Sequence, residues 1–151
     1  MNTLTALQQV VDANLDLLGI KINQRELWLE SGEMVPGSNK ENENGLHVLD
    51  LEYRLVLAVD EISNRTSGLL ILLVWNFIKS LDREGLGQPS FSVDPNDEKN
   101  SDVEINFNVR DPMNLVPVQN SPVFINGQPM GFGDGSLNTA ETLAGVHVNA
   151  G

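Results

Sequence analysis

The chain has 151 residues and no cysteine, and its 21 acidic and 9 basic residues give a formal charge of −12 at pH 7. Its length suits one small domain. Without thiols it has no disulfide, no thiolate metal site and no cysteine nucleophile. The acidic excess and the absence of a basic cluster argue against a surface that binds duplex DNA, since such binding depends on Lys and Arg at the phosphates.

The N-terminal sequence shows no basic region followed by an apolar core and a cleavage site, so we expect no secretory signal. The most apolar run, residues 69–74, is much shorter than the roughly 20 residues of a membrane span. We therefore expect a soluble protein that is intracellular when made.

The N-terminal residues predict an amphipathic helix that ends at Gly19 and packs on a sheet. Its apolar positions, spaced by three and four, are Leu4, Leu7, Val11, Leu15 and Leu18. Residues 26–30 favour a short strand, in which Trp28 is either a core residue or an interface residue; we expect the core. Gly32 to Gly45 lacks an apolar period and predicts a loop.

The central stretch has the strongest pattern. Residues 49–59 alternate apolar and polar side chains, which predicts a strand with one buried face, and at Val56 and Ala58 the second face turns apolar too. Residues 62–68 are interpreted as a connection with several possible helix caps, Ser63 among them. Leu69 to Ile78 is apolar all round except Asn76, which predicts a buried helix.

The following residues predict further strands. Phe91 to Val93 favours a strand, and Asp94 to Asp102 an acidic loop. Val103 to Val109 alternates cleanly, as an antiparallel strand over helices does, and Asp111-Pro112 is expected to break it. Leu115 to Val118 suggests an edge segment.

From Ser121 the composition changes. Val123 to Ile125 suits a strand that enters a turn at Asn126-Gly127, and six of the 13 glycines lie between Gly127 and Gly151. We interpret residues 1–120 as the domain and residues 121–151 as an extended C-terminal arm. Docking on a partner and simple terminal disorder both fit such a tail.

No catalytic, cofactor or metal site is expected. Gly131 to Gly135 lacks the strand, helix and Lys-Ser/Thr pair of a phosphate loop. Asp94, Asn96 and Glu98 have the first spacings of a calcium loop, but its later positions carry the wrong residues. His47 and His147 show no nearby carboxylate pattern.

The central unit carries a family resemblance. The segment LEYRLVLAVDEISNRTSGLLILLVWNFIKSL, followed by a turn, an acidic loop and DVEINFNVRDPMNLVPV, resembles the tail completion protein R family of contractile-tailed phages. Members have a similar strand, a helix with an aliphatic-Trp core, matched by residues 72–75, and an alternating strand, matched by residues 103–109. The resemblance covers residues 46–118, and the Gly-rich stretch from Gly127 has no counterpart.

The resemblance implies a tail-terminator-like α+β fold. We expect a single small domain with a mostly antiparallel or mixed β-sheet, helices packed on one face, and an extended Gly-rich C-terminal tail. It also implies a structural protein rather than an enzyme, without a cofactor, located in the virion tail or neck and in the host cytoplasm during assembly.

The implied function is assembly. Such proteins form a ring, typically a homohexamer, that caps the finished tail tube, stops its polymerisation and offers an attachment surface to neck and head. The implied partners are other copies of the chain, the tail tube protein, the tail sheath and the head–neck connector proteins. DNA only passes through the lumen, and no membrane is involved.

We predict interface residues in polar segments that have little core of their own, and at single charged or aromatic side chains within otherwise regular segments. Arg54 and Arg110 stand on well-patterned strands, where each either pairs with a neighbouring subunit's carboxylates or is simply solvated. Phe124 and Phe132 are the candidate docking residues of the C-terminal segment. The loops 32–45 and 94–101 are further candidates.

Three other classes of protein remain open. A hydrolase on an α/β scaffold needs a Ser, His and Asp constellation or a metal cluster. A neck adaptor or a tail-tube protein is a second alternative. A tube protein would form long open stacks rather than a single ring. A non-viral adaptor that uses its tail as a docking arm would stay monomeric.

Overall fold

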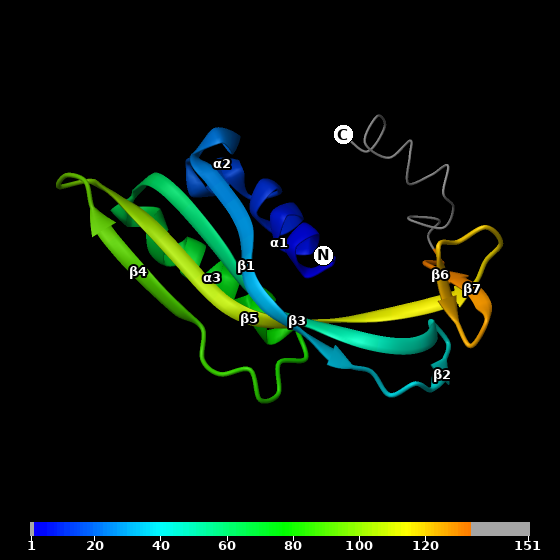
Figure 1. The fold of residues 1–151 in the computed structure, drawn as a ribbon. Helices are drawn as coiled ribbons and strands as arrows, with labels where there is room; N and C mark the ends of the chain where they lie inside the picture. Colours follow the sequence, from blue (N-terminus) through cyan, green and yellow to red (C-terminus); the bar gives the residue numbers. More distant parts are fainter. Residues whose placement is uncertain (1, 134–151) are drawn as a thin grey trace. The chain divides into compact units, whose positions relative to one another are not determined.

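The computed structural model describes residues 2–133, which form a seven-stranded antiparallel sheet with three α-helices and one short 3-10 helix (Figure 1). The strand order is β1-β3-β5-β7-β6, with β2 paired to β3 and β4 paired to β5. The predicted α+β class is confirmed. In chain order the elements are α1 (Asn2–Asp12), α2 (Leu15–Leu18), η1 (Ile22–Gln24), β1 (Arg25–Pro36), β2 (Glu41–Asn42), β3 (Gly45–Ser63), α3 (Asn64–Lys79), β4 (Ser90–Pro95), β5 (Asn100–Pro117), β6 (Val123–Ile125) and β7 (Gln128–Gly131).

The chain divides into two compact units. The first comprises Met1–Glu33 and Leu51–Asp111, and the second Met34–Asp50 and Pro112–Gly151. The first holds the helices and β4, the second holds β2 and the β6–β7 hairpin, and β1, β3 and β5 contribute to both. The division predicted at residue 120 stays a prediction, because residues 134–151 of the expected arm lie outside the described residues.

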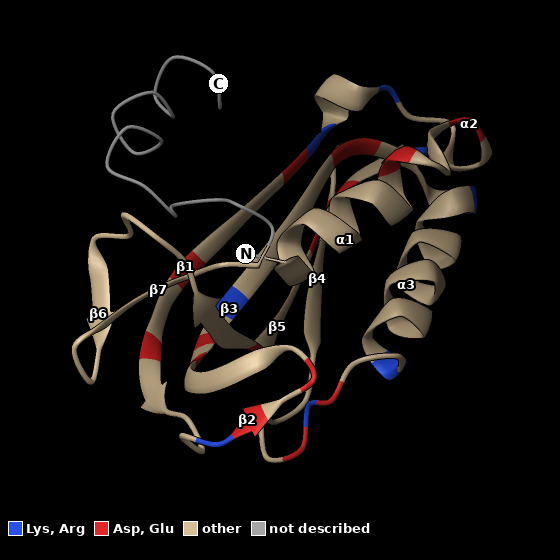
Figure 2. Ribbon diagram, turned by 90° about the vertical axis from the view of Figure 1, so that its right-hand side faces the viewer, with Lys and Arg blue, Asp and Glu red and all other residues tan. Residues whose placement is uncertain are grey.

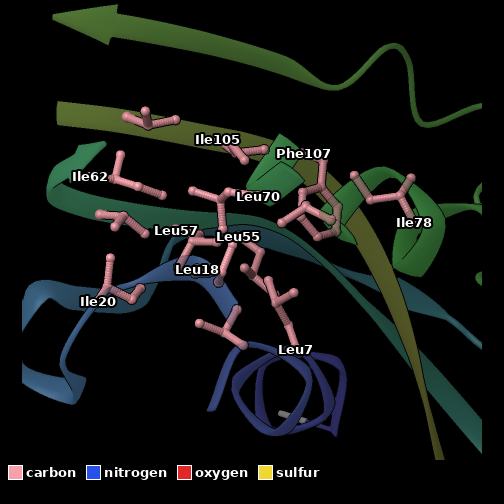
Figure 3. Close-up of a cluster of buried hydrophobic side chains, with 14 of the residues drawn as sticks. Leu7, Leu18, Ile20, Leu55, Leu57, Ile62, Leu70, Ile78, Ile105 and Phe107 are labelled. Atoms are coloured by element: carbon pink, nitrogen blue, oxygen red, sulfur yellow. The ribbon is translucent and has the colours of Figure 1, made fainter. Parts of the chain in front are cut away.

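The core of the first unit lies between one face of the sheet and the helices. Figure 2 shows α1 and α3 on the same side of the strands. The alternating side chains of β3 and β5 point into this space, where Leu55, Leu57 and Phe107 meet Leu7 of α1 and Leu70 of α3 (Figure 3). Each fully buried side chain of this size contributes about 1.5–3 kcal/mol. The predicted buried face of the central strand is confirmed.

The helix predicted for residues 4–18 forms in two pieces. Asn14 leaves the helical conformation between α1 and α2, and its side-chain amide donates to the Val10 carbonyl at 2.8 Å. A side chain that bonds the backbone in this way competes with the helix. Gly19 ends α2 in the left-handed conformation, as predicted.

The connection predicted for residues 62–68 does not exist, because β3 passes into α3 without a loop. Ser63 is the last residue of β3 and also the helix cap, since its hydroxyl accepts from the Arg65 amide at 3.1 Å. The Thr66 hydroxyl donates to the Leu18 carbonyl at 2.9 Å and holds the start of α3 beside α2.

The strands are longer than predicted at two places. The predicted loop from Gly32 to Gly45 is wrong, since β1 continues to Pro36 and β2 lies within the same stretch. Gly32 marks a close approach, because a Cβ there would overlap the Glu52 carbonyl and Tyr53.

The predicted strand break at Asp111-Pro112 is also wrong. The pairing of β5 with β4 ends at Asn106 and its pairing with β7 begins at Val116, so Pro112 removes no ladder hydrogen bond to either strand. The acidic loop after β4 shrinks to a tight turn, in which the Asp97 carboxylate accepts from the amides of Lys99 and Asn100.

The prediction of burial is wrong for Trp28 and for part of α3. Trp28 is half-buried and points to the face opposite Leu27, which packs against the core instead. In α3 only the stripe of Leu70, Val74 and Ile78 is buried, whereas Leu72 and Trp75 are 60% and 46% exposed. The helix packs on the sheet with one face only. The apolar residues on its other faces are therefore not explained by burial within this subunit.

A buried polar network ties the N-terminal helix to two strands. Asp111 of β5 accepts from the Tyr53 hydroxyl at 2.6 Å, from the Thr3 amide at 3.4 Å and from the Thr3 hydroxyl. Asp111 and Thr3 are both buried. The carboxylate also lies at the N-terminal end of α1, where negative charge is favoured. This network fixes how α1 lies on the sheet.

We expect Asp111→Asn to unfold more easily by about 2–3 kcal/mol, because an amide cannot accept from all three donors of this buried site. Urea unfolding monitored by circular dichroism measures the change. Glu104→Gln, an exposed position on the same strand, is the control and should stay within about 0.5 kcal/mol of the wild type. Equal effects of the two substitutions would contradict the network.

The same network predicts a loss of stability at high pH. Burial, and then the Asp111 carboxylate, raise the pKa of Tyr53 above its ordinary value of 10.0. Above pH 10 the unfolded chain therefore loses the proton that the folded chain still holds, and stability falls by about 1.4 kcal/mol per pH unit. Below pH 10 the contribution of the protonated hydroxyl is complete.

Urea unfolding on both sides of pH 10 measures this slope. Tyr53→Phe should be less stable at neutral pH and should lack that part of the slope. Because the chain has one tyrosine, its ultraviolet absorbance reports the ionisation directly. A phenol that titrates at its ordinary pKa in the folded protein would refute the prediction.

Candidate assembly surfaces

The four predicted interface residues lie at different places, and their roles stay predictions. Arg54 of β3 is nearly half exposed, and its Nε lies 3.8 Å from Glu30 Oε2. Arg110 of β5 is held more firmly, since its Nε lies 2.9 Å from Glu52 Oε2 and an Nη donates to the Glu84 carbonyl at 3.1 Å. Its charge is therefore matched inside its own chain.

The two phenylalanines lie in the second unit. Phe124 is exposed on β6, in register with Pro129 of β7, and Phe132 follows β7 and is half-buried. The turn at Asn126-Gly127 forms as predicted, with positive φ at both residues. Of the two, only Phe124 offers a largely uncovered ring to a partner.

Two exposed apolar positions of β4 were not predicted. Phe91 and Val93 are 59% and 43% exposed, and all six residues of this strand are exposed. Leu72 and Trp75 of α3 are further exposed apolar side chains of the first unit. The period-2 spacing of Phe91 and Val93 was the available signal, but pattern alone does not tell a covered face from an uncovered one.

The first unit also contains two open polar depressions. One, of about 420 Å³, is lined by residues that include Gly32, Glu52 and Arg54. The other, of about 410 Å³, includes Asp60, Glu61 and Asp102. The Asp102 carboxylate accepts from the Asn96 side chain at 2.8 Å and from the Glu61 amide at 2.9 Å, and these bonds lower its pKa. These hydrogen bonds give Asp102 a structural role in holding the β4–β5 turn next to the end of β3.

His47 has a carboxylate partner that the sequence analysis missed. Its Nε2 lies 2.7 Å from Asp50 Oδ1, and its Nδ1 accepts from the Ser38 amide at 3.1 Å and lies 3.2 Å from the Ser38 hydroxyl. The arrangement has the residue types of a hydrolytic triad, but the Ser38 hydroxyl also accepts from the Lys40 amide, and neither depression reaches it. It ties β3 to the segment after β1. His147 lies outside the described residues.

Within residues 2–133, no group of three or more His, Asp or Glu side chains is arranged to hold a metal ion. Over the same range no helix has the length and apolar character of a membrane span. Acidic residues occur in strands, in turns and in α2 (Figure 2).

A family model described as P2 phage tail completion protein R (GpR) matches residues 1–128 of the 151-residue chain. The match includes the resemblance at residues 46–118 and extends it over α1, α2, β1 and the β6–β7 turn. No curated protein and no solved structure matches the chain.

We expect the exposed face of α3 to contribute little to the stability of one subunit. Leu72→Ala should change the free energy of unfolding by less than about 1 kcal/mol, whereas Leu70→Ala, one buried position of the same helix, should cost about 2–5 kcal/mol. Urea unfolding at concentrations where the chain is monomeric tests the pair. Similar losses for both would mean that Leu72 is covered within the subunit.

Proposed function

The chain belongs to the P2 phage tail completion protein R family, whose members are structural phage tail proteins, and from this membership we propose that it forms a ring on the head-proximal end of the tail tube. The ring stops tube polymerisation and provides the surface to which the neck and head attach. The observation that carries the proposal is the extent of the family match, which includes every described element through β6 and the first residue of β7.

The proposed mechanism is physical. A ring requires a head-to-tail contact that closes, so each subunit shows one patch to one neighbour and a different patch to the other. One ring face must fit the growing end of the tube, and the opposite face must not accept another tube subunit. We propose six copies, with the tail tube protein, the tail sheath and the head–neck connector as the other partners.

The charge of the chain supports this assignment. A formal charge of −12 repels DNA, which suits a ring through whose lumen the genome must pass without adhering. Asp102 and Asp111 accept hydrogen bonds from the chain's own backbone and side chains. Other, exposed carboxylates would line the lumen in this proposal.

Deletion of the gene from the parent phage or prophage should give overlong tails of variable length without heads, as seen by negative-stain electron microscopy. Supplying the wild-type gene in trans should restore uniform tails and infectivity. Normal-length tails that fail to join heads would instead identify a neck adaptor. Intact, infectious particles would refute a structural role.

A further inference from the structure

The outer edge of β4 is open. β4 pairs only with β5 among the described strands, so its other edge presents a row of backbone N–H and C=O groups. Natural sheets protect such edges with Lys, bulges or covering segments. Ser90–Pro95 contains no Lys or Arg, its charged residue Asp94 and its proline Pro95 stand at the C-terminal end of the strand, and all six residues are exposed. Another extended strand can form hydrogen bonds with these backbone groups.

The apolar residues of β4 continue the core face of the sheet. Phe91 is in register with Ile105 and Val93 with Val103, and both of these β5 residues are buried in the core. Directly opposed residues of antiparallel strands point to the same face. Phe91 and Val93 therefore extend the apolar face beyond the part that the helices cover.

One flank of α3 lies beside this face. The Asn64 amide donates to the Lys99 carbonyl at 2.8 Å, and Asn64 Oδ1 accepts from the Ser101 hydroxyl at 2.7 Å, so this side of the helix faces the β5 and β4 side of the sheet. Trp75 lies eleven residues, or three turns, after Asn64 and is on the same flank. At the other end, Arg83 donates to the Asn108 carbonyl at 2.8 Å, so the helix follows β5 along its length.

Trp75, Phe91 and Val93 define the β4 edge surface. It combines an open strand edge with exposed apolar side chains.

The opposite edge of the first unit has the matching features. β1 pairs only with β3 among the described strands. Leu29 of β1 points to the same face as Leu27, which packs against the core, yet Leu29 is exposed. Leu17 of α2 and Ile22 of η1, which precede β1, are exposed too. These three residues define the β1 edge surface.

The strand directions also suit two different edges. Four antiparallel strands in the order β1-β3-β5-β4 form the sheet of the first unit. Because their number is even, β1 and β4 run in opposite directions. A neighbour related by a rotation about an axis along the strands therefore brings its β1 antiparallel to β4, which continues the ladder.

We propose that the β4 edge of one subunit adds to the β1 edge of a second copy of the chain, so that the sheets join edge to edge and the two edge surfaces cover each other. The contact is head-to-tail and closes into a ring. The inference rests on the proposed ring and names the surface that builds it.

Light scattering of the full chain during size-exclusion chromatography tests the contact. The wild type should run as a multiple of its 16.5 kDa mass. Val93→Lys and Leu29→Lys each place a charge within one edge surface and should run as 16.5 kDa monomers. Ser92→Lys is the matched control, because Ser92 opposes Glu104 on the other face of the sheet, and it should still assemble.

Mixing distinguishes a head-to-tail contact from a symmetric one. Val93→Lys keeps its β1 edge and Leu29→Lys keeps its β4 edge, so the two should combine into a one-to-one dimer and no ring. Phe91→Lys should behave like Val93→Lys, and circular dichroism should show that all variants are folded. Trp75 emission, recorded in a Trp28→Phe background, should shift to shorter wavelength when the wild-type edges assemble.

Four results would overturn the proposal: a monomeric wild type, normal assembly of Val93→Lys, a symmetric dimer of Leu29→Lys, or no dimer on mixing. Complementation separates this failure from failure of the ring function. Overlong tails in the deletion strain that Val93→Lys restores to normal would refute the edge contact and leave the function standing. Normal virions in the deletion strain would refute the function itself.

Discussion

The apolar face of the sheet in the first unit is buried beneath α1 and α3, and the rest of that unit is arranged around this contact. β3 and β5 lie in the middle of the covered region, where Leu55, Leu57 and Phe107 meet Leu7 and Leu70. The polar groups that must enter this region are satisfied by one another, as in the bonds of Asp111 with Tyr53 and Thr3. Such a network orients α1 as well as stabilising it, because a carboxylate with several donors accepts few alternative geometries.

The helices do not cover the apolar face of the sheet as far as its edge strands. Phe91 and Val93 share the face of Ile105 and Val103 but lie beyond the helices, and Leu29 stands in the same relation to Leu27. In a monomer these exposed strand edges favour aggregation, because open edges with apolar side chains can pair non-specifically with other chains. In the proposed ring each β4 edge would pair with the β1 edge of the next copy. The acidic charge of the chain disfavours unspecific association while copies are free.

The polar clusters of the described residues serve the fold. His47 joins Asp50 to Ser38, Asp102 accepts from Asn96 and Glu61, and Arg110 pairs with Glu52. Each has the residue types of a chemical site, and each lies outside a closed pocket or has its donors and acceptors in use. A structural protein of the phage tail acts through shape and contact, so the informative residues are exposed apolar ones rather than titratable ones.

The sequence by itself determined the elements with a strong local signal. The alternation in β3 and β5, the stop at Gly19 and the turn at Asn126-Gly127 are set by side-chain period and backbone preference, which act over a few residues. The family resemblance of residues 46–118 was visible for the same reason. Tertiary structure decided what lies over each face: it left Leu72 and Trp75 exposed, carried β1 and β5 past Gly32 and Pro112, and brought His47 to Asp50. Burial and edge pairing depend on segments far apart in the chain, so an apolar helix that builds a core and one that awaits a partner have the same local pattern.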